Sequence, residues 1–519
     1  MSLTGWILLI LLLIYIPLWI WVWRSPKAAK YGLEKYGPCI KINTQLGKKS
    51  MDKVAKYHRF WRAMGVFSQV ASFVMMAVIV YVVVVAVINL PNSLQSSTSI
   101  GIEYVLAIPG LNPLLPFWYA LLALIIALVC HEFAHGVQTR TNGMRVKNTG
   151  LLYGVVPLGA FVEPEQEDVE KASRRVKLDL YCAGITTNFV IAGVAFIIMS
   201  AGMLGGLTSD YSDNAAVWQE TDDSPAYDAG IPAGAIITEV NGVTFYYTDD
   251  CDEYQGTEYG WEPGQTVSVT YLTEGNEETT VTMQWGVYLT QIADDSAASE
   301  AGLEAGTFIT KIKTSDGTVY KFYTQEQFSD FMSTTSGGDT ITVYTLAEGE
   351  TDVSNTTSYK IVLDSNNGIG YLGVYLTTSG MNLITPDILL ETASNPVYGA
   401  DGIFETVQYS LSYLSLPFYG MDPIPESVQW WYDAGDGFWI LAELLYWIFW
   451  LNLMLGICNA LPAVPFDGGY IFMGWADWVL EKMGKKDPKA REEQAADITH
   501  NISVLMIFLY ALVIVAVLV

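Results

Sequence analysis

Histidine and cysteine are both scarce in this chain. Its 519 residues include 4 histidines and 5 cysteines. The cysteines are Cys39, Cys130, Cys182, Cys251 and Cys458, which are scattered and form no C-x-x-C pair. The sequence therefore supports neither a disulfide framework nor a metal site built from thiolates.

Charged residues are absent from several long stretches. Residues 111–130 read LNPLLPFWYALLALIIALVC, which is the composition of a membrane span. Six apolar runs are long enough to cross a bilayer: Trp6 to Trp23, Phe67 to Leu90, Leu114 to Val137, Leu178 to Leu204, Phe438 to Leu461 and Ile502 to Val519. Because 51% of the residues are hydrophobic, the sequence predicts an α-helical integral membrane protein in contact with the lipid bilayer.

Lysine and arginine are nearly absent from one polar block. Between Leu207 and Thr385 there are 28 Asp and Glu residues but only 4 Lys and Arg, so most of the net charge of −27 lies there. An acidic block of this kind argues against a nucleic-acid partner. It indicates a solvated domain outside the membrane.

The distribution of basic residues predicts the orientation of the chain. Of the 27 Lys and Arg residues, 11 lie between Arg24 and Arg62, 7 between Arg140 and Lys177, and 5 between Lys482 and Arg491. Since basic loops stay in the cytoplasm, we expect these three segments there. The N-terminus and the acidic block are then extracytoplasmic, and the first apolar run is an uncleaved anchor.

The acidic block contains a repeat with an offset of 72 residues. Segments 223–238 and 295–310 both read D-S-x-A-x-acidic-A-G-apolar-x-A-G-x-apolar-I-T. This pattern predicts a short helix that ends at a glycine and is followed by a strand. It resembles the circularly permuted PDZ domain, with a pair of generic β-rich modules as the alternative. Because GVYLT also recurs at 286–290 and 373–377, both a tandem and a nested arrangement stay open.

A metal-ligand motif ends the third apolar run. Residues 131–135 read His-Glu-Phe-Ala-His, and on a helix this spacing places His131 and His135 on one face with Glu132 beside them. The pattern is typical of zinc proteases, in which the glutamate takes a proton from metal-bound water. Charged groups inside a span are costly, so we expect a functional site, near the cytoplasmic end of this span. His58 and His500 are expected to be surface or interface residues.

Catalytic zinc usually has three protein ligands, and Asp467 is the candidate for the third. It is the only acidic residue between Glu443 and Asp477, and the predicted topology places it in the same leaflet as His135. The neighbouring Pro462, Pro465, Gly468 and Gly469 break the helix and let the backbone approach the site. The alternative role for Asp467, as N-cap of the following helix, is compatible with ligation.

These motifs together resemble the site-2 protease family of intramembrane zinc metalloproteases. The resemblance rests on His131-Glu-x-x-His135, on Gly184-x-x-x-Asn188, and on Asn459-x-x-Pro462 followed by Asp467-Gly468. Segment 151–162 is similar to the family's hairpin that dips into the membrane after the zinc helix. The acidic repeats are similar to its PDZ insert.

The resemblance implies one catalytic Zn²⁺ held by His131, His135 and Asp467, with Glu132 as the general base. It also implies transmembrane protein substrates that are cut in or near their spans, after an upstream site-1-type protease. The residues that it indicates for substrate binding are Asn188, Asn459, Pro462, Val155, Leu158 and Gly159, the last three on a strand edge. The PDZ-like region would either bind a new C-terminus or exclude large ectodomains.

The predicted fold is an α-helical polytopic membrane protein of about six spans with an inserted β-rich, tandem PDZ-like extracytoplasmic region. Its segments are 1–63 (anchor and basic loop), 64–206 (spans two to four), 207–285 and 286–380 (PDZ-like domains), 381–437 (interfacial helix and linker) and 438–519 (last two spans). An ordinary packed helix is the alternative for the interfacial helix. The rival function is a non-catalytic membrane scaffold with a structural metal site, which would not need Glu132.

Overall fold

The computed structural model describes residues 3–88, 90, 109, 112–155, 157–246, 260–366 and 368–518. The chain divides into two compact units. The membrane unit consists of residues 1–203, 410–422 and 440–519, and the polar unit of residues 204–409 and 423–439. Each unit is described by itself below.

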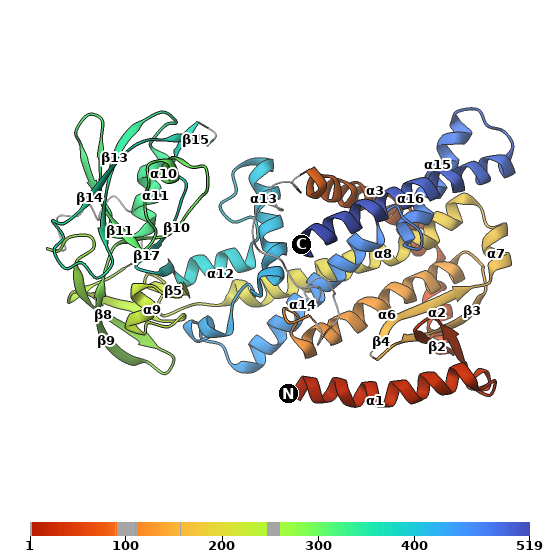
Figure 1. Ribbon diagram of the computed structural model, residues 1–519. Helices are drawn as coiled ribbons and strands as arrows, with labels where there is room; N and C mark the ends of the chain where they lie inside the picture. Colours follow the sequence, from red (N-terminus) through yellow and green to blue (C-terminus); the bar gives the residue numbers. More distant parts are fainter. Residues whose placement is uncertain are drawn as a thin grey trace. The chain divides into compact units, whose positions relative to one another are not determined.

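Long apolar helices form most of the membrane unit (Figure 1). They are α1 (Leu3–Arg24), α3 (His58–Ile88), α6 (Phe117–Thr141), α8 (Arg174–Ile197), α14 (Asp436–Asn459) and α16 (Pro488–Leu518). Shorter helices are η1 (Ala28–Tyr31), α2 (Lys48–Ala55), α7 (Gln166–Lys171), η2 (Ile198–Met203) and α15 (Asp467–Lys482).

Five helices are long and apolar enough to cross a membrane: His58–Ile88, Phe117–Thr141, Arg174–Gly206, Asp436–Asn459 and Pro488–Val515. The second to sixth predicted spans overlap them, although Asn89 and Val519 lie outside the described residues. The described apolar part of α1, Leu9–Arg24, is shorter, so a sixth span stays a prediction. Apolar side chains such as Val70 and Phe508, each 61% exposed, face outward, as a lipid environment allows. The chain is therefore an integral membrane protein.

A four-stranded antiparallel sheet lies in the membrane unit. Its order is β1 (Leu33–Tyr36), β2 (Cys39–Thr44), β3 (Val146–Tyr153) and β4 (Pro157–Pro164). The expected hairpin at 151–162 is part of β3 and β4, and β4 forms one edge of the sheet. Glu163 accepts hydrogen bonds from Lys147 and Lys41, at 2.9 and 3.0 Å, which lower the pKa of its carboxyl. This carboxylate thereby joins β2, β3 and β4.

The polar unit contains an antiparallel sheet of twelve strands. Its main path runs β14 (Thr357–Val362), β13 (Thr340–Ala347), β11 (Thr307–Thr314), β10 (Val287–Ile292), β17 (Val374–Thr378), β18 (Met381–Ile384), β5 (Ala215–Glu220), β6 (Ile236–Val240), β8 (Thr266–Thr273) and β9 (Glu277–Gln284). Side strands are β7 (Val243–Thr244) and β12 (Val319–Lys321), and β15 (Asp364–Asn366) pairs with β16 (Ile369–Tyr371).

The two largest hydrophobic cores among the described residues of the polar unit lie along this sheet. The first surrounds Trp285 and includes Met381, whereas the second surrounds Phe322 and draws its buried members from residues 287–372. Strand β18 follows the second core in the chain but pairs with β5 of the first. The second module is therefore nested within the first rather than simply following it.

The two repeats have matching local structures. Ser224 and Ser296 cap the short helices α9 (Pro225–Ala229) and α10 (Ala297–Glu300), and strands β6 and β11 follow. Glycine at the end of each helix adopts a positive φ, 77° at Gly230 and 74° at Gly302, which few other residues tolerate. The structure has the predicted order of helix, glycine and strand in both repeats.

The remaining helices of the described residues are η3 (Leu204–Gly206), α11 (Gln325–Ser333), α12 (Pro386–Ser394), α13 (Gly402–Ser415), η5 (Leu416–Tyr419) and η6 (Glu426–Trp431). Four of them, α12, α13, η5 and η6, lie in the chain between β18 and α14. The start of α13 presents Ile403 and Phe404 at 86% and 80% exposure. The contact of this helix with the outer membrane face stays a prediction.

Acid should weaken the junction between the hairpin and α7. Two side-chain hydrogen bonds of 2.9 Å from Arg145, together with one from its backbone N–H, lower the pKa of Asp168 from 3.8 to about 2. A lowered native pKa means that this stabilisation is complete above about pH 4 and is lost as the pH falls through about 2. The difference in unfolding midpoint between the wild type and Asp168→Asn should shrink over that range. A difference that stays constant down to pH 2 would contradict the assignment.

Candidate metal centre

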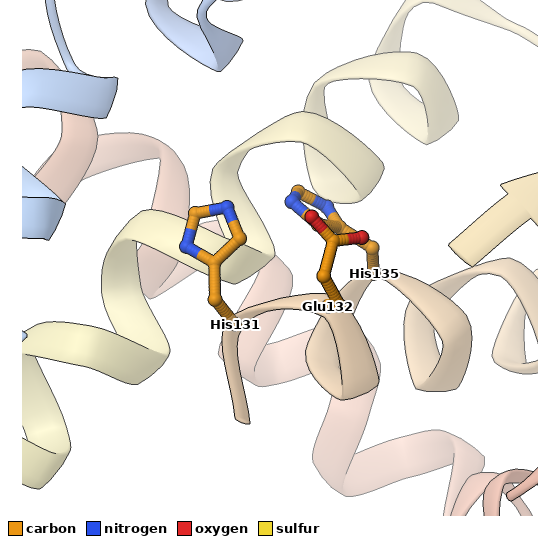
Figure 2. A group of neighbouring side chains, drawn as sticks. All are labelled: His131, Glu132 and His135. Atoms are coloured by element: carbon orange, nitrogen blue, oxygen red, sulfur yellow. The ribbon is translucent and has the colours of Figure 1, made fainter. Parts of the chain in front are cut away.

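Helix α6 carries His131, Glu132 and His135 on adjoining turns (Figure 2). The ligand atoms of these three side chains all lie within 4.8 Å of one another. The two histidines are buried, with 5% and 8% of their surface exposed. The i, i+4 spacing therefore brings two imidazoles and a carboxylate together, as the sequence predicted.

Asp467 completes the arrangement from the other end of the chain. Its Oδ2 lies 3.1 Å from Nε2 of His131 and 3.1 Å from Nε2 of His135. Asp467 is the first residue of α15, and Phe466 occupies the N-cap position. The carboxylate is thus directed to the histidines instead of capping the helix.

Glycines allow the backbone to approach this centre. A Cβ atom at Gly184 of α8 would lie 2.5 Å from Nε2 of both His131 and His135. In the first turn of α15, a Cβ at Gly468 would lie 2.3 Å from the carbonyl oxygen of Leu461. Any larger residue at either position would have to displace its neighbours.

A backbone carbonyl orients one of the histidines. Nδ1 of His135 donates a hydrogen bond of 2.8 Å to the carbonyl oxygen of Leu180 in α8. This bond orients the ring so that Nε2, the other nitrogen, faces the carboxylate of Asp467. Metal-ligating histidines commonly have such a partner on their second nitrogen.

The donor set fits a zinc ion. Two imidazole nitrogens and one carboxylate oxygen are the ligands of many catalytic zinc sites. Ligand atoms about 2.0–2.1 Å from a tetrahedral zinc lie roughly 3.3 Å apart. The 3.1 Å separations between Asp467 Oδ2 and each Nε2 are close to that spacing.

Glu132 lies between this centre and the edge of the four-stranded sheet. Its Oε2 accepts a hydrogen bond of 2.9 Å from the backbone N–H of Val162 in β4. That N–H points away from β3, so the free edge of β4 faces the carboxylate. The general base that the sequence predicts is therefore positioned by the strand predicted to hold substrate.

The predicted substrate-binding residues occupy two places in the membrane unit. Asn188 on α8 is fully buried, and neither atom of its amide has a hydrogen-bond partner in the described part of the chain. Asn459 ends α14, donating to the carbonyl of Leu455 at 2.9 Å, and Pro462 lies in the turn that leads to Asp467. Their roles stay predictions.

The other three predicted residues belong to the hairpin. Val155 lies in the turn and packs against the cluster around Tyr15 and Ile40, which gives it a structural role. Gly159 is in β4 opposite Leu152. Leu158 is also in β4, but its side chain lies outside the described part of the structure.

The comparisons with known proteins identify the family. Residues 119–509 match the model of peptidase family M50. The chain belongs to peptidase family M50. This is the site-2 protease family that the motifs resemble.

Two relatives of this M50 peptidase align over part of their length. An uncharacterized protein of Methanocaldococcus jannaschii is 29% identical over 161 residues, which is 31% of this chain and 42% of that protein. A Clostridium perfringens protein named "Putative zinc metalloprotease" is 26% identical over 156 residues, which is 25% of this chain and 44% of that protein. The matched region thus spans less than half the length of either relative.

Sequence reasoning missed two polar features of the membrane unit. Asn452 is fully buried in α14, where its Nδ2 donates to Ile448 while Oδ1 has no partner among the described residues. An amide in the middle of an apolar span was the available signal. The carbonyl of Leu180 could not have been found in this way, because every residue has one.

Enlarging Gly184 should disrupt metal binding. In Gly184→Ala the new methyl group would displace both histidine rings, so we expect zinc affinity to fall about 10- to 100-fold. Gly193→Ala is the matched control on the same helix, because a Cβ there meets no atom within 4 Å. Equal zinc content in the two purified variants would contradict this packing.

Removing the carboxylate of Asp467 should weaken zinc retention further. Loss of a residue that only holds a metal ligand in place lowers metal affinity about 10- to 100-fold. Because Asp467 is itself a proposed ligand, we expect Asp467→Asn to lower zinc affinity at least about 100-fold. Metal analysis after dialysis against a chelator measures this. Undiminished binding would require another acid. Glu163, the alternative in the neighbouring hairpin, is instead engaged by Lys41 and Lys147.

Proposed function

We propose that this M50 peptidase is an intramembrane zinc endopeptidase that cuts membrane-anchored proteins within or near their spans. The observation that carries the proposal is the convergence of His131, His135 and Asp467 beside Glu132, with both histidines on a helix fit to cross a membrane. A scaffold with a structural metal site would gain nothing from Glu132.

The chemistry divides between the metal and one carboxylate. A zinc ion held by His131, His135 and Asp467 would supply a Lewis acid and make water acidic enough to ionise near neutral pH. Glu132 would accept the proton of that water and return it to the leaving nitrogen of the peptide. Family membership and the named relative support a metalloprotease with this chemistry.

Substrate would have to be extended before it is cut. The carbonyls of a transmembrane helix are occupied by i→i−4 hydrogen bonds, and hydrocarbon offers no other partners. The free edge of β4 supplies backbone groups that could pair with an unwound segment by strand addition. The unpaired amide of Asn188 could bind its backbone or the developing oxyanion.

The two units would divide recognition from chemistry. The metal centre would lie toward the cytoplasmic side, with the N-terminus and the PDZ-like region outside, an orientation that the distribution of basic residues supports. This region would exclude substrates with intact ectodomains, so that an upstream site-1-type protease must act first. We favour exclusion over capture of a new C-terminus, because an acidic region attracts a carboxylate poorly.

Replacing the base should abolish cleavage without removing the metal. In Glu132→Gln we expect cleavage of a co-expressed single-span substrate to fall about 10²- to 10⁴-fold, the usual contribution of general acid–base catalysis. Zinc content should stay at the wild-type value, since the three proposed ligands are unchanged. Immunoblotting of the substrate and metal analysis of the same preparations test both points. Wild-type cleavage by Glu132→Gln would refute the proposed function.

A further inference from the structure

A cavity of about 640 Å³ lies among the helix ends of the membrane unit. Its walls come from α7, the start of α8, one side of α15 from Tyr470 to Glu481, and the start of α16. This volume is within the roughly 300–1,000 Å³ of typical ligand sites. Neither the metal ligands nor Glu132 line it, so the proposed chemistry leaves it unused.

Two elements, β4 and α8, lead from the proposed metal centre to the cavity. Pro164, the last residue of β4, lines it and is two residues beyond Val162, whose N–H bonds Glu132. Tyr181 also lines it and follows Leu180, the hydrogen-bond partner of His135. Thus a chain that continues along β4 past Glu132 reaches the cavity within two residues.

An aromatic pair forms the wall nearest the metal centre. Tyr181 of α8 and Tyr470 of α15 stack with their ring centroids 4.6 Å apart and their planes within 13°. Tyr470 is one helical turn after Asp467. The flat faces and edges of these rings offer an extended peptide an apolar contact surface.

The charges of the cavity are mostly neutralised by each other. Arg174 contacts Asp477 at 2.8 Å and Glu481 at 2.7 Å, and Lys177 contacts Glu492 at 3.2 Å. A second arginine, Arg491, holds Asp477 at 2.6 Å. These pairs join α8, α15 and α16 and fix the shape of the wall.

Glu170 differs from the other acids of this wall. It lies on α7, is exposed, and accepts a hydrogen bond of 3.0 Å from Gln166, while no ion pair of the described residues includes it. A cationic group entering the cavity would therefore meet one carboxylate that is free to pair. The cytoplasmic flanks of membrane spans are enriched in lysine and arginine.

We propose that this cavity binds the basic juxtamembrane segment on the cytoplasmic side of the substrate's scissile bond, with Glu170 pairing with a lysine or arginine. The inference rests on the proposed function, because it extends the substrate path from the edge of β4. The continuity of β4 with the cavity favours a polypeptide over a separate small molecule.

A charge-reversal experiment tests the pairing. Two single-span substrates that differ only in a cytoplasmic flank of lysines or of glutamates are compared with the wild type and Glu170→Lys. We expect Glu170→Lys to lower kcat/KM on the basic flank about fivefold, the scale of one exposed ion pair. It should raise kcat/KM on the acidic flank. The matched control is Glu167→Lys, which makes the same change on the same helix outside the cavity and should alter neither rate.

A labelling experiment tests occupancy without cleavage. Met473 lines the cavity, so Met473→Cys in a Glu132→Gln background should react with a water-soluble maleimide. Addition of the basic-flank substrate should slow that reaction. The labelling of Glu132→Gln without the new cysteine is subtracted, because it reports the native cysteines. If the wild type cleaves but the substrate leaves the labelling rate unchanged, the inference is overturned. It is also overturned if Glu170→Lys and Glu167→Lys change kcat/KM equally. Failure of the wild type to cleave would instead refute the proposed function.

Discussion

The approach of one carboxylate to two imidazoles is the contact on which the membrane unit depends. A buried carboxylate is costly in an apolar environment unless it is paired. Asp467 gains partners only if α6 and the turn after α14 meet at hydrogen-bonding distance, which they do at 3.1 Å. Gly184 and Gly468 make that approach sterically feasible, and Leu180 holds one imidazole in orientation. Three separated stretches of chain, on α6, α8 and α15, are thereby fixed around one point.

A second constraint is the unpaired edge of a sheet beside apolar helices. Backbone groups without partners are tolerated at membrane depth only where protein or a water-filled cavity surrounds them. Here Glu132 satisfies the N–H of Val162, and the strands β1 and β2 cover the opposite side of the hairpin. No described strand pairs with this edge of β4, and the last residue of the strand lines the cavity beside Tyr181.

Sequence reasoning succeeded where a short pattern determines geometry. The spacing of His131 and His135 defines a helix face, and isolation in an apolar stretch singled out Asp467. Sequence reasoning failed for strands that pair with partners far away in the sequence and that carry no distinctive side chains. Strand β2 pairs with β3 across about a hundred residues, and β18 closes the first core only after the whole second core has intervened. Pairing of this kind depends on backbone groups that every residue has, so composition and periodicity could not predict the register.

In the proposed mechanism, the hydrogen bond between Glu132 and Val162 would couple binding to chemistry. A strand added to β4 would have its register set by the backbone groups of that edge. The same edge holds the Glu132 carboxylate that would accept the proton. The register of the peptide and the position of the base would therefore both be set by β4. A substrate segment that pairs one residue out of register presents a different carbonyl to the metal centre. Selection among peptide bonds would therefore depend on strand pairing as much as on the side chains next to the cut.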